Sequence, residues 1–413
     1  MHICIFQTGE PLHIDEGQYR PMRCMLLADK LLAEGYSVTI ISSSFFHQRK
    51  SFRSKSFKTI KIQDRLTIHL IPSLGYKKHI SLKRIIDHLF LALNLHLFLR
   101  KQRSFKPDRI FIGFPPILSS FIISRWALKS NIPYIVDVKD KWPEIFIEPF
   151  PNILKPLAVF LTKPFFMVTI YVFKKASKIT TISKGYVSWI KKLLKLKKSS
   201  IFISPLIRKP INLREEDKNL NKILFINKGI NLNKDQYFCF VGSYSKSFDF
   251  NFIGKLSKRI INKYPNIKII LCGTGDQYEI LIKKFKDYPN LFIFGEINLY
   301  EAKLLIKKSL ATLAPYKNNP NFNDHIPNKI IESLENGIPF ITTIDGKLKD
   351  LIEKENNGIY IKNKKNIDIT KIEKLINDKM FRANLKLNAR RSYKKLFNFD
   401  ETYSNIINNL KNL

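Results

Sequence analysis

The stretch that decides the fold is His325-Ile-Pro-Asn-Lys-Ile-Ile-Glu-Ser-Leu-Glu-Asn-Gly-Ile-Pro-Phe-Ile341. Pro327 suits the first turn of a helix, where its missing N–H leaves no hydrogen bond unmade, and Gly337 is placed to end that helix. Between them apolar side chains recur at helical spacing, and Phe340–Thr343 reads as a short buried strand. The stretch therefore predicts a loop–helix–loop–strand unit.

Two acids flank the start of this helix. Asp324 lies in the polar loop before it, and Glu332 lies eight positions later, inside the helix. A helix N-terminus offers free N–H groups and partial positive charge that suit a phosphate, and a carboxylate about a turn and a half further in could accept a sugar hydroxyl. The alternative, a surface helix with two solvated acids, fits the spacing equally well.

Length and composition limit the class of protein. The 413-residue chain is long enough for two domains, and its four cysteines are far apart and form no CxxC pair. This usage favours a reducing compartment and argues against a structural zinc site or a disulfide framework. Met1–Phe6 reads as a strand start and lacks the features of a signal peptide. The formal net charge of +37 implies anionic partners such as nucleotide sugars, acidic lipid surfaces or nucleic acid, although we attribute part of it to a base-composition skew.

Two series of alternating strands and helices run along the chain. The first opens with a strand at Ile3–Phe6, a glycine-containing loop, a helix at Met22–Glu34 and a strand at Val38–Ser42. The loop is not a GxGxxG fingerprint, so no dinucleotide cofactor is implied. Gly17 in this loop either lets a ligand approach the backbone or only makes a turn.

The second series begins at Tyr237, after a charged, Asn-rich segment over 209–233 that reads as a linker. We therefore predict an α/β fold class with two Rossmann-like, doubly wound domains and an interdomain cleft. We place the domains at 1–215 and 235–395. A C-terminal helix follows at 396–413, and it could cross back to the first domain.

Asp137-Val-Lys-Asp-Lys-Trp-Pro-Glu144 lies at the end of a predicted strand, on the sheet edge where open α/β sheets bind ligands. Asp137 and Asp140 either serve a ligand there or cap a helix and pair with lysines. A second segment, Ile153–Phe173, is the most apolar long one, but its two lysines and two prolines argue against a transmembrane helix. Either it packs within its domain or it lies on a membrane surface beside basic residues.

Six motifs, in the same order and at matching spacing, resemble the family 4 glycosyltransferases of the GT-B fold, especially the bacterial enzymes that build cell-surface polysaccharides such as O-antigen and capsule. The similarity runs nearly end to end. In this chain the motifs read Gly9-Glu-Pro-Leu-His-Ile-Asp-Glu-Gly17 followed by Arg20-Pro-Met-Arg23, His47 with Arg49-Lys50, Val136-Asp-Val-Lys-Asp-Lys-Trp-Pro143, Phe240-Val-Gly-Ser-Tyr-Ser-Lys246, Gly273-Thr-Gly-Asp276, and the acid pair from Asp324 to Glu332.

The resemblance implies a retaining glycosyltransferase that moves a hexosyl or N-acetylhexosaminyl group from a nucleoside-diphosphate sugar, usually UDP-linked. It places the donor on the C-terminal domain and the acceptor on the N-terminal one. No metal or other cofactor is expected, because backbone N–H groups and cations can take the charge of the leaving diphosphate. The implied catalytic residues are Asp324 and Asp140; the donor-side residues are Glu332, Lys329, Asn328, Pro327, Gly17, Lys246, Ser243, Gly242 and Gly273; and the acceptor-side residues are Arg20, Arg23, His47 and Asp137.

The chain departs from the family pattern at two places. Many members carry an Arg and a Lys after the strand that opens the donor domain, whereas Ser243 and Phe248 stand near those places here and Lys246 is the nearby cation. Many members also carry a His before the acceptor-side Asp, whereas Lys139 precedes Asp140 here.

The expected partners are a UDP-sugar donor, a lipid-linked saccharide acceptor and an anionic membrane surface. The expected location is the cytoplasmic face of the cytoplasmic membrane, with peripheral association. Nucleic acid is not expected, because the lysines are dispersed and no binding module appears. The alternatives are a sugar-nucleotide 2-epimerase of the same fold and a basic nucleic-acid-binding protein without enzymatic activity.

Overall fold

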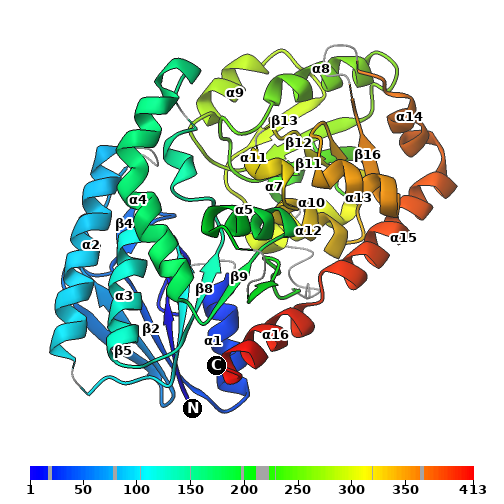
Figure 1. Cartoon of the computed structure of the whole chain (residues 1–413). Coiled ribbons are helices and arrows are strands. Elements are labelled where there is room, and N and C mark those ends of the chain that lie inside the picture. The colour runs from blue at the N-terminus through cyan, green and yellow to red at the C-terminus, as the bar shows by residue number, and fades with distance from the viewer. Residues whose placement is uncertain are drawn as a thin grey trace. The chain divides into compact units, whose positions relative to one another are not determined.

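The computed structural model describes residues 1–16, 21–77, 81–102, 104–148, 150–196, 200–210, 223–227, 229–318, 320–362 and 367–413. The chain folds as two compact units (Figure 1), Met1–Lys209 with Phe399–Leu413, and Pro210–Asn398. Each unit is built on a parallel sheet that carries helices, so the predicted class of two Rossmann-like α/β domains is confirmed.

The first unit contains an eight-stranded sheet in the order β10-β9-β8-β7-β1-β2-β6-β5. Its pairs are parallel up to the edge strand β5, which runs antiparallel to β6. The strand order turns back between β1 and β7, and this switch point is where open α/β sheets bind ligands. The strands are β1 (His2–Phe6), β2 (Ser37–Ser43), β5 (Lys58–Gln63), β6 (Leu66–Ile71), β7 (Arg109–Phe114), β8 (Tyr134–Val138), β9 (Lys178–Thr181) and β10 (Ile201–Ile203), with a separate pair β3 (Phe45–Phe46) and β4 (Ser51–Phe52).

Helices cover both faces of this sheet because its strands are apolar on both sides. Along β1, Cys4 and Phe6 point into one hydrophobic core, whereas Ile3 and Ile5 point into the other. The first core also holds residues of α2, α3, α4 and α5, and the second holds residues of α1 and α16. These helices are α1 (Arg23–Ala33), α2 (Leu82–Lys101), α3 (Ile117–Lys129), α4 (Lys155–Lys175), α5 (Lys184–Leu194) and α16 (Phe399–Lys411), and two short 3-10 turns are η1 (Glu144–Phe146) and η2 (Asn152–Leu154).

Helix α4 differs between its two halves. Its C-terminal half buries Thr169, Val172 and Phe173, whereas Phe160 in its N-terminal half is 71% exposed. Packing within the domain, the first interpretation of this segment, therefore fits the C-terminal half. Lying on a membrane surface, the second interpretation, fits the N-terminal half. Within the described part of the chain, Asn152–Lys175 is the one helical segment long and apolar enough to cross a membrane. Contrary to our expectation, composition alone therefore does not exclude a transmembrane span.

The second unit contains a six-stranded parallel sheet in the order β13-β12-β11-β14-β15-β16, with its switch point between β11 and β14. Its strands are β11 (Tyr237–Val241), β12 (Lys268–Cys272), β13 (Leu291–Phe294), β14 (Ala311–Ala314), β15 (Phe340–Thr342) and β16 (Gly358–Tyr360). Its helices are α7 (Ile223–Ile226), α8 (Phe250–Ile261), α9 (Tyr278–Lys284), α10 (Leu299–Lys308), α11 (Pro320–Asn323), α12 (Asn328–Glu335), α13 (Lys347–Glu355), α14 (Thr370–Asn377) and α15 (Lys379–Leu396).

The stretch that opened the sequence analysis folds as expected, with one shift and one addition. Pro327 is the N-cap of α12 rather than a residue of its first turn, and Gly337 follows the helix at a φ of +66°, where a Cβ would be strained. The loop before α12 contains the short helix α11, which the polar sequence did not reveal.

Candidate functional site

A cavity of about 250 Å³ opens at the carboxyl edge of the first sheet, at its switch point. Loops that follow β1, β2, β7 and β8 form most of its wall, so residues that are far apart in the sequence meet there. Helix α2 closes one side. The residues that matter below are Gln7–Glu10 after β1, His47 after β3, Tyr76 before α2, Arg84, Asp87 and His88 on α2, and Lys139 and Asp140 after β8.

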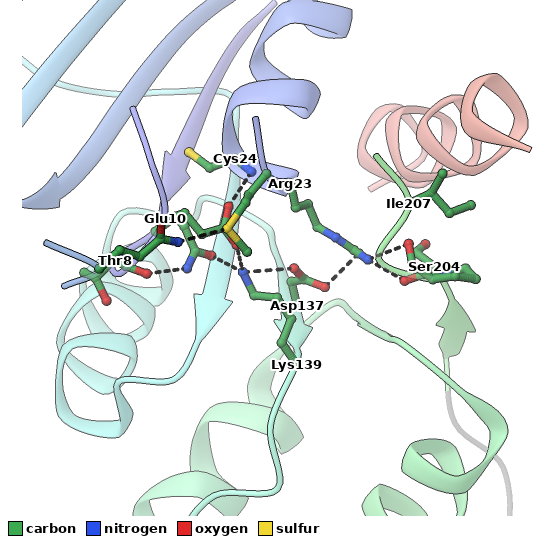
Figure 2. Close-up of polar contacts among 12 residues, drawn as sticks. Thr8, Glu10, Arg23, Cys24, Asp137, Lys139, Ser204 and Ile207 are labelled. Atoms are coloured by element: carbon green, nitrogen blue, oxygen red, sulfur yellow. Dashed lines mark hydrogen bonds and ion pairs between the residues drawn. The ribbon is translucent and has the colours of Figure 1, made fainter. Parts of the chain in front are cut away.

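Two acids and two bases form a buried network beside this cavity (Figure 2). Lys139 Nζ donates to a carboxylate oxygen of Glu10 and lies 3.8 Å from Asp137 Oδ2. Arg23 Nη1 donates to Asp137 Oδ1 at 3.0 Å, and Arg23 Nη2 donates to the carbonyl oxygens of Ser204 and Pro205. Because the four charges balance, the network ties the loops together rather than attracting an anion.

This network includes Arg23 and Asp137, two residues that the resemblance implied on the acceptor side. Their side chains are 1% and 0% exposed, and among the described residues neither belongs to the cavity wall. Burial raises the pKa of Asp137, while the positive charges of Arg23 and Lys139 oppose that rise. Arg23 and Asp137 are buried because they pair with each other, so they hold the loops in place without facing the cavity.

Asp140 and His47 do line the cavity. Solvent reaches Asp140, but protein atoms crowd it, and this desolvation raises the pKa of its carboxyl against the opposing charges of Lys139 and Arg84. His47 Nδ1 is hydrogen-bonded to the Tyr76 hydroxyl, and Lys50 Nζ lies 3.3 Å from the same nitrogen. The cavity wall thus combines the carboxylates of Glu10, Asp87 and Asp140 with two imidazoles and the cations Arg84 and Lys139.

Arg53 is a structural residue that sequence reasoning missed. Its guanidinium donates two hydrogen bonds of 2.7 Å to the Asp15 carboxylate and a third of 2.9 Å to the Glu10 carbonyl. The pair is buried, and it fixes the loop that leads toward Gly17. Gly17 and Arg20 lie outside the described residues. Nothing in the sequence marks Arg53 as the partner of an aspartate that precedes it by 38 positions.

At the switch point of the second sheet, the backbone rather than side chains forms the surface. Gly242 follows β11 with a φ of +151°, and Gly273 follows β12 with a φ of +154°. A Cβ on Gly273 would come within 1.7 Å of the Gly242 carbonyl oxygen, and a Cβ on Gly242 within 1.3 Å of Lys329 Nζ. Only glycine fits at either place, which explains why these two of the predicted donor-side residues, Gly242 and Gly273, are glycines.

Lys329 brings a cation to this point. It is the second residue of α12, and its Nζ donates to the Val241 carbonyl oxygen at 3.0 Å. The same Nζ lies 5.0 Å from the Phe240 ring centroid and 5.2 Å from that of Phe248. These contacts hold the ammonium at the carboxyl end of β11, directly over Gly242.

The acids of the opening stretch lie on either side of the start of α12. Asp324 lies in the turn after α11 and Glu332 in the second turn of α12, and both are half-buried. Glu332 is three residues after Lys329 and therefore shares a face of the helix with it. Pro327 and Asn328 form the helix start itself, where N–H groups are unused by the helix.

The loop after β11 carries the remaining predicted residues, Ser243 and Lys246, and both are exposed. Backbone bonds tie this loop to the one that follows β14: the Asp249 N–H donates to the Pro315 carbonyl at 2.6 Å, and the Lys317 N–H donates to the Ser247 carbonyl at 3.0 Å. The two loops that border the switch point are thus joined. In the described residues, no group of three His, Cys, Asp or Glu side chains is placed to hold a metal ion.

Comparisons with known proteins agree with this geometry. Residues 222–392 match the model of the family Glycosyl transferases group 1. A search of curated proteins found no match. Among solved structures, sucrose-phosphate synthase from Thermosynechococcus elongatus is similar over 100% of this chain and 98% of its own, with a TM-score of 0.72 and 12% identity.

Two further structures are similar over both whole chains or nearly so. Alr3699/HepE from Anabaena, in complex with UDP and glucose, covers 100% of each chain with a TM-score of 0.65 and 12% identity. WaaG, a glycosyltransferase involved in lipopolysaccharide biosynthesis, covers 99% of each chain with a TM-score of 0.63 and 13% identity. The second half of the chain thus carries the match to the glycosyl transferases group 1 model, and the chain as a whole has the fold of GT-B glycosyltransferases.

Proposed function

We propose that this protein is a retaining glycosyltransferase that moves a sugar from a nucleoside-diphosphate donor, UDP-linked, to a lipid-linked saccharide. The sugar transfer takes place on the cytoplasmic face of the membrane during cell-surface polysaccharide biosynthesis, as the resemblance to family 4 implies. The donor binds the second unit and the acceptor binds the first. The cleft between them, which transfer requires, stays a prediction.

The observation that carries the proposal is the glycine–lysine surface at the switch point of the second sheet. Lys329 Nζ lies over Gly242, and the Gly242 carbonyl packs against Gly273, so backbone and one ammonium meet at the ends of β11 and β12. A diphosphate needs a close backbone approach and local positive charge, and both are present here. The matching family model spans this whole surface, and HepE, similar in fold, was solved with UDP and with UDP-glucose.

In the reaction, negative charge develops on the diphosphate as the bond from the anomeric carbon to its oxygen breaks. Lys329 and the partial positive charge at the start of α12 would stabilise that charge, and Lys246 in the neighbouring loop would add to the effect. Glu332 would accept the ribose hydroxyls, and Asp324 would face the donor sugar. We expect no metal requirement, because this charge has partners in the protein itself.

On the first unit, Asp140 is the carboxylate that faces the cavity and would orient the acceptor hydroxyl. Its raised pKa, caused by desolvation, brings it toward the range of a group that exchanges a proton with a substrate. Arg23, Asp137 and Lys139 would keep the loops that hold it in place.

Membrane association is proposed on the basis of the exposed apolar side chains of the first unit. Leu82 at the start of α2 is 77% exposed and Ile153 before α4 is 86% exposed. Exposed Lys83 and Lys163 lie on the same two helices and would meet anionic lipids. WaaG, similar in fold, acts in lipopolysaccharide biosynthesis.

The test is the release of UDP from a panel of UDP-sugars in the presence of a lipid-linked acceptor extract, with the anomeric configuration of the product read by NMR. Glu332→Ala should lower UDP release at least about a hundredfold, because a charged hydrogen-bonding partner of the donor is lost. Glu335→Ala, on the same helix but paired with Lys303 at 3.0 Å, is the matched control and should keep its activity.

Conversion of a UDP-sugar to its C2 epimer, without a transferred sugar on any acceptor, would favour the epimerase alternative. An unchanged rate in Glu332→Ala, together with native unfolding behaviour, would remove this helix from the donor site.

A further inference from the structure

A second cavity lies beside the first one in the N-terminal unit. It has a volume of about 590 Å³ and runs between the N-terminal halves of α2 and α4, which lie on the same side of the unit (Figure 1). Its wall is mostly apolar, with Ile85 from α2, Trp142 and Phe146 from the loop after β8, and Leu161 and Phe165 from α4. We call it the α2–α4 groove.

Apart from Arg84, the polar groups in this groove are hydrogen-bonded or uncharged. The Thr162 hydroxyl donates to the Ala158 carbonyl at 2.7 Å, so it has no proton left to donate to a ligand. Burial, with Arg84 nearby, lowers the pKa of His88 to about 3, so the ring is neutral at any physiological pH. The interior therefore suits a hydrocarbon and disfavours a saccharide.

Arg84 and His88 line both this groove and the switch-point cavity, so the two spaces meet at these side chains. The Arg84 guanidinium lies 5.0 Å from the Trp142 ring and 5.5 Å from the Tyr76 ring. Stacking on aromatic rings holds a guanidinium flat and fixes where its positive charge lies. A molecule that passes from one space to the other must pass this cation.

A second cation stands near this junction. Lys50 Nζ lies 4.6 Å over the Tyr76 ring, and burial together with the charge of Arg84 lowers the pKa of Lys50 to about 8. Lys50 also holds a φ of +56°, uncommon for a residue with a Cβ. Two acids are close as well: Asp140, whose carboxyl faces the cavity, and Asp87, which is buried and accepts from Ser73 and the Gly75 N–H. Two cations and two acids thus lie near the junction, and the two cations share the Tyr76 ring, whereas the Asp87 carboxylate is engaged by Ser73 and Gly75.

We infer that the α2–α4 groove binds the hydrocarbon chain of a lipid phosphate whose phosphate lies at Arg84 and Lys50 and whose saccharide extends into the switch-point cavity toward Asp140. The inference deepens the proposed function and rests on it for the identity of the saccharide. The exposed apolar residues at the rim, Leu82 and Ile153, supply continuity with a membrane from which such a chain would enter.

The test measures binding of farnesyl phosphate below its micellar concentration to the full-length protein by isothermal titration calorimetry, with farnesol and inorganic phosphate as separate ligands. Leu161→Asp places a charge on the groove wall and should weaken farnesyl phosphate at least about tenfold. Leu157→Asp is the matched control, since Leu157 lies one turn earlier on α4, is 56% exposed and is outside the groove wall. It should bind as the native protein does.

Arg84→Gln should weaken farnesyl phosphate binding at least about fivefold and leave farnesol binding unchanged, whereas Arg100→Gln, at the exposed far end of α2, should change neither. Equal loss in Leu161→Asp and Leu157→Asp, or no loss in either, overturns the inference, as does tighter binding of inorganic phosphate than of farnesyl phosphate. The assay contains no sugar donor. Lipid binding without UDP release would therefore refute the proposed function alone, and UDP release with a lipid-linked acceptor but without binding of farnesyl phosphate would refute the groove alone.

Discussion

The two switch points of this protein have the same topology and opposite construction. In the first sheet, strand order turns back between β1 and β7, and charged side chains hold the surrounding loops: Lys139 with Glu10, and Arg23 with Asp137. In the second, the order turns back between β11 and β14, and the surface is backbone at Gly242 and Gly273. One edge is built from paired charges, the other from glycines and one lysine.

The difference fits the two kinds of ligand that the proposed function requires. Glycine loops and a helix start present N–H groups at fixed positions, which suit a group common to all nucleotide donors, the diphosphate. A cavity walled by side chains can be reshaped by substitution, which suits an acceptor that varies from enzyme to enzyme. The buried ion pairs of the first unit then serve to hold such a variable wall in one conformation.

The largest effect is expected from breaking the paired charges. Arg23→Met leaves the fully buried Asp137 carboxylate with only Lys139, at 3.8 Å, and should lower the free energy of unfolding by about 3–5 kcal/mol. Urea unfolding followed by circular dichroism measures this loss.

Lys30→Met is the control for that substitution. Lys30 lies on the same helix and pairs with Asp400, but the Asp400 side chain is 77% exposed, so the loss should be below about 1 kcal/mol. Equal losses of unfolding free energy in the two variants would show that the buried network stabilises the fold no more than a surface ion pair does.

The next effect is expected from adding a side chain to the glycine surface. Gly242→Ala places a Cβ where Lys329 Nζ lies, which displaces the ammonium from the Val241 carbonyl, and UDP affinity should fall at least about tenfold. Gly295→Ala is the control, because its Cβ would meet only the Tyr278 hydroxyl at 3.6 Å. Titration calorimetry with UDP compares them, and native affinity in Gly242→Ala would place the nucleotide elsewhere.

The smallest effect concerns pH at the junction of the two cavities in the first unit. The pKa of Lys50 is lowered to about 8, so Lys50 loses its charge as the pH rises from 7 to 9, while a phosphate monoester is already doubly charged. The Tyr76 hydroxyl beside Lys50 does not titrate in this window, because burial raises the pKa of Tyr76 to about 12. His47 also contacts Lys50.

Farnesyl phosphate affinity should therefore fall about threefold from pH 7 to pH 9 as the Coulomb attraction of one ammonium is lost near the surface. Lys50→Arg should flatten the profile, because its charge persists. A profile that is equally steep in Lys50→Arg would assign the titration to another group.

Local signals in the sequence were enough to predict most of the helices and strands. The pairing of Pro327 with Gly337, around apolar residues at helical spacing, located α12 within one residue. The edge strand β5 was missed, because its alternation rests on only two apolar residues, Ile60 and Ile62, and both of its faces are largely exposed. Strand β10 was also missed; it has 3 residues, all of them half-buried, whereas the equally short β15 is fully buried and was predicted.

The site was predictable where glycine geometry or a motif marks it, and not where distant charges pair. Gly242 and Gly273 stand directly after buried strands, and the structure gives each a steric reason. Arg23 and Asp137 are 114 positions apart, so their mutual burial leaves no local signal, and the motif alone suggested contact with a ligand. Lys139 stood in the sequence as a departure from the family pattern, and its partners, Glu10 and Asp137, became visible only in the structure.

The central claim is that the nucleotide binds the glycine surface of the second unit and not the charged cavity of the first. Hydrogen–deuterium exchange of the full-length protein with and without UDP tests it most directly. UDP should slow exchange at 242–248, 273–277 and 327–332 and leave 7–10 and 139–142 unchanged. Protection confined to the first unit, or none in the second at saturating UDP, would contradict the account.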